Sequence, residues 1–477
     1  MPKKKLAIGG AVVVALAVIG VILGIIVSRL GDDDVPGSDT YGSTSSGSGE
    51  SSTATPSDGT SKASKKKTNT TKLITSDPTT ATFSLCVFAI GDWGTTLYQD
   101  SCCTRSETYT NFDIVAEDVV ASLMDTQAST LETDLKVILG HGDNFYYTGI
   151  NSEKGRNSRF MSTFESKFKG KFLLNIPFCN VLGNHDYGGG SFICSYDDEP
   201  AKCGSVTEII VGLENKFKWQ QEYTSYNNER WVLKDHFYVY SIEDAESGVS
   251  IDIFNVDTGD ADVHAALQVC CQCFGYSEGN DDSCKGVARG HKFCAGGDTE
   301  MYDACFAKFV EWSDDSRKQL AEKVATSTAT WKIVNSHYSP HVHYDEEGMK
   351  EWFDVLEGSG IHVWMYGHTH GEKHDYSEPL GVHFVENGAG GGIQKESASG
   401  LTAYAAKYAK NMWTYSGNEY GFFSVKASEE WLKLQYHTAD SSWSFGSSMN
   451  ETTIGGVETK HCWFIPADGT EGKECTP

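Results

Sequence analysis

The stretch LKVILGHGDNFYYTG, from Leu135 to Gly149, places an acidic turn and three consecutive aromatic residues directly after a short apolar run. Such a β-branched run is typical of a strand that is buried on both faces. The Gly-Asp pair alone carries little information, because both residues are common in turns. The stretch becomes informative only if other apolar runs of the chain end in comparable polar clusters.

Four other apolar runs also end in polar side chains. In α/β sheets, ligands bind where the carboxyl ends of the strands meet, so the clusters are expected to converge on one rim. One cluster alone is most simply an ordinary turn, but their recurrence at strand ends favours a common site. The five runs are 83–90, followed by Asp92; 135–139, followed by Asp143 and Tyr146; 176–182, followed by Asn184, His185 and Asp186; 331–335, followed by His337, His341 and His343; and 361–366, followed by His368 and His370.

The residue types in these clusters point to a pair of metal ions. Two aspartates, an Asn carbonyl, a phenol and three histidines can serve two ions if one carboxylate bridges them. Carboxylate and phenolate oxygens suit Fe(III), whereas imidazole with an amide oxygen suits divalent Zn, Mn or Fe. The set contains no thiolate, which argues against a structural zinc site. Two metals about 3.5–4 Å apart can clamp the attacking and leaving oxygens of a phosphoryl displacement.

Helical patterns lie between the apolar runs, and this alternation predicts an α/β domain built in layers. The runs 237–242 and 250–257 predict further strands. The segments 420–427 and 429–439 alternate as a closing hairpin would. The predicted helices show apolar faces at helical spacing, formed by Ile114, Val115, Val119 and Leu123 in one helix and by Met349, Trp352, Phe353 and Leu356 in the other.

In their order along the chain, the five clusters resemble the motif series of the metallophosphoesterase (calcineurin-like) superfamily, and within it the small, tartrate-resistant type of purple acid phosphatase. That series is GDxG, GDxxY, GNH(D/E), an isolated His and GHxH, and GDNFYYTG is very close to the small-type form. The resemblance extends from about Phe83 to about Phe445 and includes FNVDT (254–258) and NGAGG (387–391). It implies a four-layer α/β/β/α sandwich of two mixed sheets flanked by helices.

The resemblance also implies roles for the site residues. Asp143 would bridge the two metals of a binuclear centre that holds Fe(III) plus Fe(II), Zn or Mn. His185 would contact the phosphate or the leaving oxygen, and Asp186 would orient its ring. His341 and His343 are both candidates for a further phosphate contact. Asp92, Asp143, Tyr146 and His370 would hold the ferric ion, and Asn184, His337 and His368 would complete the second metal site with Asp143.

The function implied by the resemblance is an acid phosphatase that hydrolyses phosphate monoesters with a metal-activated hydroxide. A covalent phosphoenzyme is not expected, because no Cys or Ser nucleophile lies in the motifs. A phosphodiesterase or nucleotide pyrophosphatase of the same superfamily is the nearest alternative. A non-catalytic cell-surface recognition protein on this fold is a second alternative. The formal net charge of −26 argues against nucleic acid as a partner.

The N-terminal sequence predicts a membrane anchor. Residues 1–5 contain three lysines and are expected to form a short cytoplasmic tail. The uncharged run 6–28 would be roughly 34 Å long as a helix, which is enough to cross a bilayer. Lysines before the run and aspartates after it predict a single-pass type II protein with an extracellular or luminal catalytic domain. The alternative is a cleaved signal peptide, which would give a secreted protein.

Composition divides the rest of the chain. A stalk rich in Ser, Thr and Gly (29–80) is too polar to bury a core and is expected to be disordered. The catalytic domain is expected at 81–449, with Cys-rich insertions near 187–236 and 258–305. Residues 450–477 are interpreted as a C-terminal tail.

Fourteen cysteines on an extracytoplasmic chain indicate disulfide bonds, whose pairing the sequence does not give. Cys86 and Cys179 lie in strand-like runs and are alternatively buried thiols. The segment CCQC (270–273) lacks the spaced pairs of a typical zinc site. Two glycosylation sequons predict N-glycans at Asn69 and Asn450.

Overall fold

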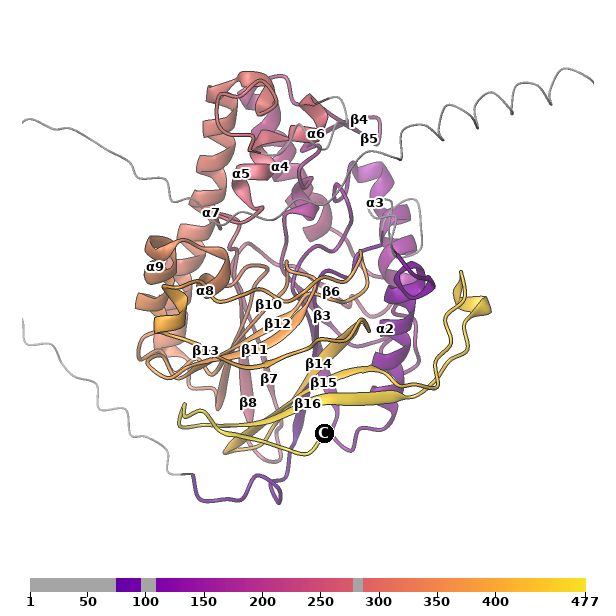
Figure 1. Ribbon diagram of the computed structural model, residues 1–477, viewed down its shortest axis with the longest axis vertical. Coiled ribbons are helices and arrows are strands. Elements are labelled where there is room, and N and C mark those ends of the chain that lie inside the picture. The colour runs from indigo at the N-terminus through magenta and orange to yellow at the C-terminus, as the bar shows by residue number, and fades with distance from the viewer. Residues whose placement is uncertain (1–73, 96–108, 278–285) are drawn as a thin grey trace, which may run out of the picture. The chain divides into compact units, whose positions relative to one another are not determined.

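Within the described residues, two mixed β-sheets pack face to face at the centre of the structure (Figure 1). In spatial order the first sheet consists of β17 (Lys473–Glu474), β16 (Val457–Pro466), β15 (Trp431–Ala439), β14 (Gly421–Ala427), β1 (Leu85–Ile90), β2 (Leu135–Gly140), β3 (Phe178–Asn180) and β6 (Trp231–Val232). The second consists of β13 (Lys410–Thr414), β11 (Glu372–Ser377), β12 (Val382–Asn387), β10 (Val363–Tyr366), β9 (Trp331–Asn335), β8 (Ser250–Asn255) and β7 (Tyr238–Glu243). The neighbours β1–β2–β3 run parallel, as do β8–β9–β10–β12.

This computed structural model describes residues 74–95, 109–277 and 286–477, all of which belong to one compact unit. The predicted cytoplasmic tail, the apolar run 6–28, the greater part of the stalk and the sequon at Asn69 lie outside the described residues. In the part of the chain that is described, no helix has the length and apolar character that crossing a membrane requires.

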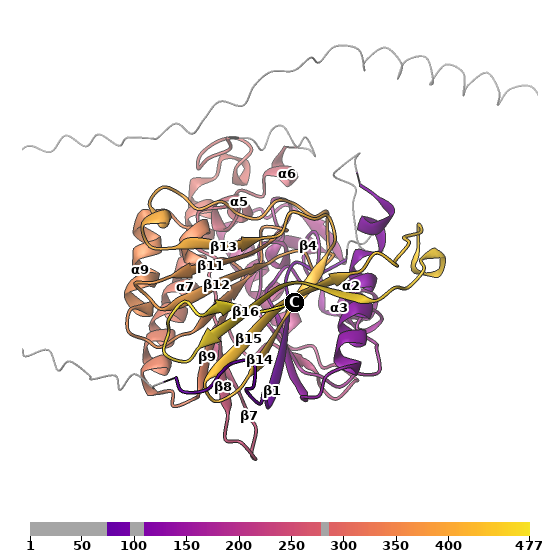
Figure 2. The ribbon, with the colours of Figure 1, turned by 60° about the horizontal axis from the view of Figure 1, so that its bottom comes forward.

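The strands alternate their side chains between two cores. Val87 of β1 and Ile333 of β9 point into the space between the sheets, whereas Phe88 of β1 points outward. The outer face of the first sheet is covered by α2 (Asn111–Ser129), and that of the second by α7 (Thr299–Thr326) and α9 (Glu346–Leu356). Figure 2 shows α2 on one side of the sheets and α9 on the other. The expected four-layer α/β/β/α arrangement is confirmed, as are both predicted helices.

The remaining elements lie in the loops between the strands. The helices are α3 (Glu153–Phe160), α4 (Val206–Gln221), α5 (Ala266–Cys271), α6 (Cys273–Tyr276) and α8 (Pro340–His343), and a small hairpin is formed by β4 (Cys194–Tyr196) and β5 (Glu199–Ala201). The predicted insertion near 187–236 contains β4, β5 and α4, and the one near 258–305 contains α5 and α6.

Disulfide bonds fix both insertions. Cys194 pairs with Cys203 in the first, while Cys270–Cys305 and Cys271–Cys294 tie α5 to the start of α7 and to the preceding loop. Two cysteines of the CCQC segment are thus disulfide-bonded. Cys86 and Cys179 are buried thiols on β1 and β3, and burial raises the pKa of Cys86 to about 12.

The end of the chain is part of the first sheet. The strand β16 pairs antiparallel with β15 along its whole length, and the disulfide Cys462–Cys475 closes its turn to β17. The sequence prediction ended the domain at residue 449, so it ended too early. The physical reason is that the first half of β16 carries polar, partly exposed side chains, which gave no apolar run to recognise.

Lys216 of α4 fastens the first insertion to the loop that follows β2. Its side chain is fully buried, and its ammonium group donates to the carbonyl oxygen of Thr148 and to Oδ1 of Asn151 (2.6 Å). Burial lowers the pKa of Lys216 to about 7. The insertion is therefore attached through a buried polar contact to the loop that carries Asp143.

Candidate metal centre

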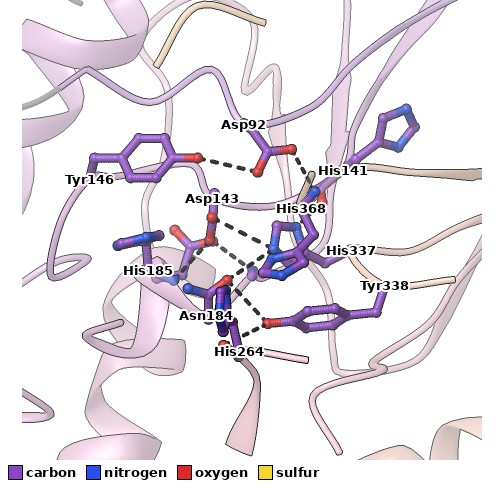
Figure 3. A network of polar contacts seen from close by, with 12 residues as sticks. Asp92, His141, Asp143, Tyr146, Asn184, His185, His264, His337, Tyr338 and His368 are labelled. Atoms are coloured by element: carbon purple, nitrogen blue, oxygen red, sulfur yellow. Dashed lines mark hydrogen bonds and ion pairs between the residues drawn. The ribbon is translucent and has the colours of Figure 1, made fainter. Parts of the chain in front are cut away.

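The polar clusters that follow five strands meet at one end of the two sheets (Figure 3). Three of the clusters follow β1, β2 and β3 of the first sheet, and two follow β9 and β10 of the second. The rim predicted from the sequence is thus shared between the sheets. Asp92, Asp143 and His368 each adopt a positive φ (53°, 52° and 72°), a strained conformation for residues other than glycine that is common at functional sites.

Asp92, Asp143 and His337 each offer a ligand atom, and these atoms lie within 4.8 Å of one another. Nε2 of His337 lies 3.6 Å from Oδ2 of Asp143 and 3.2 Å from Oδ1 of Asn184. Nδ1 of His337 donates to the carbonyl oxygen of His141 at 2.7 Å. A histidine held in this way presents the lone pair of Nε2 to its site, as metal ligands commonly do.

The second half of the cluster, around Asp92, Tyr146 and His370, also contains a histidine whose Nδ1 is held by a backbone carbonyl. The phenol of Tyr146 donates to Oδ1 of Asp92 at 3.2 Å and lies 3.2 Å from Nε2 of His370. Nδ1 of His370 donates to the carbonyl oxygen of Gln394 at 3.1 Å, which again turns Nε2 inward. The guanidinium of Arg159 holds the loop that follows β2, because it donates to the carbonyl oxygen of Tyr146 at 2.6 Å.

The pKa shifts and the unpaired polar atoms of the cluster favour bound cations. Burial, together with the neighbouring carboxylate of Asp143, raises the pKa of Asp92 well above its usual range, and burial raises the pKa of Asp143 to about 7. Burial lowers the pKa of His337 to about 3, so that imidazole is neutral. Nδ1 of His368 is buried and has no hydrogen-bond partner among the described residues. Buried carboxylates, neutral imidazoles and an unpaired ring nitrogen together fit a pair of bound cations.

A cavity of about 310 Å³ opens beside this cluster. Asp143, Asn184, His368 and His370 line it, together with His185. The predicted ligands that reach the cavity are therefore drawn from three of the five clusters.

His185 is oriented by a backbone carbonyl. Its Nδ1 donates to the carbonyl oxygen of Tyr147 at 2.8 Å, and its backbone N–H donates to Oδ1 of Asp143 at 2.8 Å. The carboxylate of Asp186 instead accepts the backbone N–H groups of Gly183 (2.8 Å) and Asn144 (3.1 Å). Asp186 thus ties the loops after β2 and β3 together, and the orienting contact at Nδ1 that was predicted for it comes from Tyr147.

The two histidines predicted as further phosphate contacts do not line the cavity. His341 is fully buried, with Nε2 3.0 Å from Oδ2 of Asp375 and Nδ1 2.7 Å from Oγ of Ser339. His343 lies behind His368 and is 3.3 Å from the hydroxyl of Thr369. They point apart because residues two positions apart on a helical turn do not share a face, and both brace the loops that carry the predicted ligands.

Sequence reasoning missed His264, which lines the cavity from the second insertion. Its ring centroid lies 5.9 Å from that of His368, and its carbonyl oxygen accepts a hydrogen bond from the hydroxyl of Tyr338. Tyr338 also donates to Oδ1 of Asn184 at 3.1 Å. A signal was present in the sequence, since His264 belongs to the polar segment that follows the apolar run 250–257.

Comparison with known proteins agrees with this geometry. The family described as calcineurin-like phosphoesterase matches residues 87–372. Tartrate-resistant acid phosphatase type 5 of Sus scrofa is 29% identical over 170 residues, which cover 36% of this chain and 38% of that protein. Purple acid phosphatase 17 of Arabidopsis thaliana is 24% identical over 264 residues, which cover 54% of this chain and 59% of that protein. Each match thus spans less than two thirds of the relative.

A longer match is found with tartrate-resistant acid phosphatase type 5 of Homo sapiens, 24% identical over 316 residues that cover 65% of this chain and 74% of that protein. Among solved structures, a purple acid phosphatase from yellow lupin (Lupinus luteus) seeds is similar with a TM-score of 0.40 and 13% identity, over 80% of this chain and 54% of that one. At that similarity the structure adds nothing to the family match.

We expect Asp143→Asn to abolish stabilisation by added metal and to make the metal-free chain more stable at neutral pH. The folded pKa of about 7 exceeds the unfolded value of about 3.9. Between these pH values the folded chain binds more protons, so the free energy of unfolding falls as pH rises, by up to about 1.4 kcal/mol per unit. The variant lacks the contribution of Asp143 to this fall, whereas other buried carboxylates such as Asp186, whose pKa burial raises to about 8, still contribute.

Urea unfolding of chelator-treated and Zn²⁺- or Mn²⁺-loaded protein at several pH values between 5 and 8 measures both effects. Asp354→Asn, at an exposed position of α9, is the control and should match the wild type. A variant that is still stabilised by metal as strongly as the wild type would contradict the role assigned to Asp143.

Proposed function

Because the chain belongs to the calcineurin-like phosphoesterase family, we propose that it is an acid phosphatase that hydrolyses phosphate monoesters at a binuclear metal centre. The observation that carries the proposal is the buried pair Asp92 and Asp143, surrounded by imidazole, phenol and amide donors from both sheets. The acid phosphatases among the similar proteins support the same reaction class. The names of these relatives favour monoesters over diesters.

Seven residues would hold the two metals. Asp143 lies between the two halves of the cluster and is the carboxylate that both metals would share. When bound, the metals supply charge that neutralises the phosphate and lowers the pKa of a water molecule so that it can act as the nucleophile. Asp92, Tyr146 and His370 would complete one site, and Asn184, His337 and His368 the other.

The chain's own residues position the substrate and the proton. Nδ1 of His185 is engaged by the carbonyl oxygen of Tyr147, so Nε2 is the nitrogen that can reach a phosphate oxygen in the cavity. His264 lines the same cavity from the opposite loop. At acidic pH a protonated imidazole can donate to the phosphate or pass its proton to the leaving oxygen. His185 and His264 are therefore the proposed substrate contacts.

Tyr146 favours a ferric ion in one of the two sites. Burial and the neighbouring Asp92 and Asp143 carboxylates raise the pKa of its phenol well above the usual range. A phenolate at this position therefore requires a strongly charged cation beside it. Fe(III) suits phenolate and carboxylate oxygens, and the second site suits a divalent Fe, Zn or Mn.

We further propose that the catalytic domain faces an oxidising compartment, tethered by the apolar run 6–28 or released by its cleavage. The disulfides of the insertions and of the chain end support an extracellular or luminal site. Asn450 is exposed, as an N-glycan acceptor must be.

We expect the purified chain to hydrolyse p-nitrophenyl phosphate much faster than bis(p-nitrophenyl) phosphate. Asn184→Ala removes a metal ligand and should lower kcat by roughly 100-fold or more, since ligands and their supports strongly affect metal affinity. Chelator treatment should abolish the activity of the wild type, and added metal should restore it. Faster hydrolysis of the diester would replace the proposal by a phosphodiesterase, and hydrolysis of neither would favour a non-catalytic role.

We expect protein expressed with iron to show a visible charge-transfer band that Tyr146→Phe removes. The phenolate is the group that would donate charge to Fe(III), whereas a phenyl ring has no oxygen. Absorption spectra and metal analysis of the two proteins measure the effect. Tyr147→Phe, which alters the neighbouring ring only, is the control and should keep the band. Stoichiometric zinc without colour in the wild type would contradict the ferric assignment.

We expect His264→Gln and His185→Gln to lower kcat/KM for a monoester by about 10²-fold or more, because each removes a proton donor from the cavity. His341→Gln should leave kcat/KM much closer to the wild type and should chiefly lower the stability, because its ring faces Asp375. Steady-state kinetics and urea unfolding separate the two effects. The reverse ranking would restore His341 as the phosphate contact.

A further inference from the structure

A second cavity, of about 570 Å³, lies beside the 310 Å³ cavity at the candidate metal centre, which we call the catalytic cavity. The two cavities share Val263, His264 and Gln268 in their walls, so they adjoin along this one loop of the second insertion. The rest of the second cavity is largely apolar, with Leu267, Phe274 and Val287 among its lining residues. We call it the side cavity.

The wall of the side cavity is fixed to loops that carry site residues. The backbone N–H of Phe274 donates to the carbonyl oxygen of Gly190 at 2.8 Å, and Gly190 lines the catalytic cavity. On the other side, the backbone N–H of Asp262 donates to the carbonyl oxygen of His343 at 2.9 Å. The disulfides Cys270–Cys305 and Cys271–Cys294 hold α5 between these contacts. The side cavity is therefore held in a set position relative to the metal centre.

Two apolar side chains of this wall are open to solvent. Val263 is 39% exposed and Leu267 is 41% exposed, although both belong to a segment whose other apolar residues, Ala265, Ala266 and Val269, are buried. Exposed apolar surface at the edge of a concave site is typical of a surface that binds an apolar group. This apolar surface lies beside the candidate metal centre, so the apolar group that it would bind is a part of the substrate.

The charge of the walls restricts the substrate further. Among the described residues that line the two cavities, none is a lysine or an arginine, whereas Asp262 and Glu396 are present. A leaving group with phosphates of its own, such as a nucleoside diphosphate, would find no lysine or arginine among these described residues and would meet carboxylates. Among the described lining residues, the positive charge beyond that of the metals would be that of the His185 and His264 imidazoles, and both would serve the scissile phosphate.

We propose that the side cavity binds the leaving group of the substrate, and that this group is an uncharged alcohol with an apolar chain or ring. The inference rests on the proposed function, because it requires the phosphoryl group to lie in the catalytic cavity. His264 and Gln268 stand where the two cavities join, which is where the ester oxygen of such a substrate would lie. Val263, Leu267, Phe274 and Val287 then determine which alcohols are accepted.

Binding of n-alkylphosphonates, which cannot be hydrolysed, tests the side cavity independently of turnover. Calorimetric titration of the full-length, metal-loaded chain with the ethyl, butyl, hexyl and octyl compounds, below their micelle concentrations, should give affinities that rise roughly two- to fourfold per methylene, as expected for partial to full burial of each CH₂. Equal affinities for all four compounds would overturn the proposal.

Two variants locate the effect. Val263→Thr keeps the shape of the side chain and replaces one methyl group by a hydroxyl, and Leu267→Asn replaces an exposed apolar group by an amide. Each should lower the ratio of octyl to ethyl affinity by about threefold or more. Ile454→Asn, at a 60% exposed apolar position outside both cavities, is the matched control and should keep the ratio. A chain-length dependence that both cavity variants leave intact would place the apolar contact elsewhere and overturn the proposal.

Hydrolysis of the matching n-alkyl phosphates separates this inference from the proposed function. These esters have leaving groups of nearly equal basicity, so differences in kcat/KM report binding of the chain. Hydrolysis without dependence on chain length would uphold the phosphatase and overturn the side cavity. A chain-length dependence of phosphonate binding without hydrolysis would uphold the side cavity as a binding site and overturn the phosphatase.

Discussion

Two buried carboxylates at the ends of neighbouring parallel strands are the constraint on which the site depends. Asp92 and Asp143 are each about 1% exposed, and burial opposes their charge. Each is held by a backbone N–H of another loop, Asp92 by that of His368 and Asp143 by that of His185, both at 2.8 Å. These hydrogen bonds, even with the one that Tyr146 donates to Asp92, do not offset the burial of two adjacent carboxylates. The lone pairs of His337 and His370, turned inward by backbone carbonyls, fit bound cations at this place.

The site also requires that the carboxyl ends of the strands of both sheets lie next to each other. Hydrogen bonds of the Asn335 side chain connect the two sheets at this edge. Asn335 is the last residue of β9, and its amide donates to the carbonyl oxygen of Cys179 at 3.1 Å and to Oδ1 of Asn255 at 2.8 Å. Its Oδ1 lies 2.6 Å from Nδ1 of His141. One side chain of the second sheet thus contacts β3 and the loop after β2 of the first, directly beneath the ligands. The same loop supplies the carbonyl that orients His337.

The convergence of the polar clusters was predictable from sequence because it depends on local order, a buried strand followed at once by a polar turn. The helices α2 and α9 were predictable from their apolar spacing for the same reason. The division of the strands between two sheets was not, since periodicity does not reveal strand partners. His264 was missed because its position beside His368 depends on how an insertion folds back. For His341 and His343, spacing alone could not tell which way each ring turns, and the buried Asp375 that receives His341 is distant in sequence.

The insertion that carries His264 adds a wall beside the metal centre, and this wall can determine which substrates are accepted. The contacts of the wall at Gly190 and His343 reach the loops of the metal centre through backbone atoms, so the side chains of Val263 and Leu267 are not used to hold it in place. Disulfides restrict the loop before any ligand arrives, which reduces the entropy lost on binding. Under the proposed function, phosphoryl chemistry would depend on the strand ends, and the choice of alcohol would depend on Val263, Leu267 and their neighbours. A change in those side chains can alter specificity while the ligands of the metals stay in place.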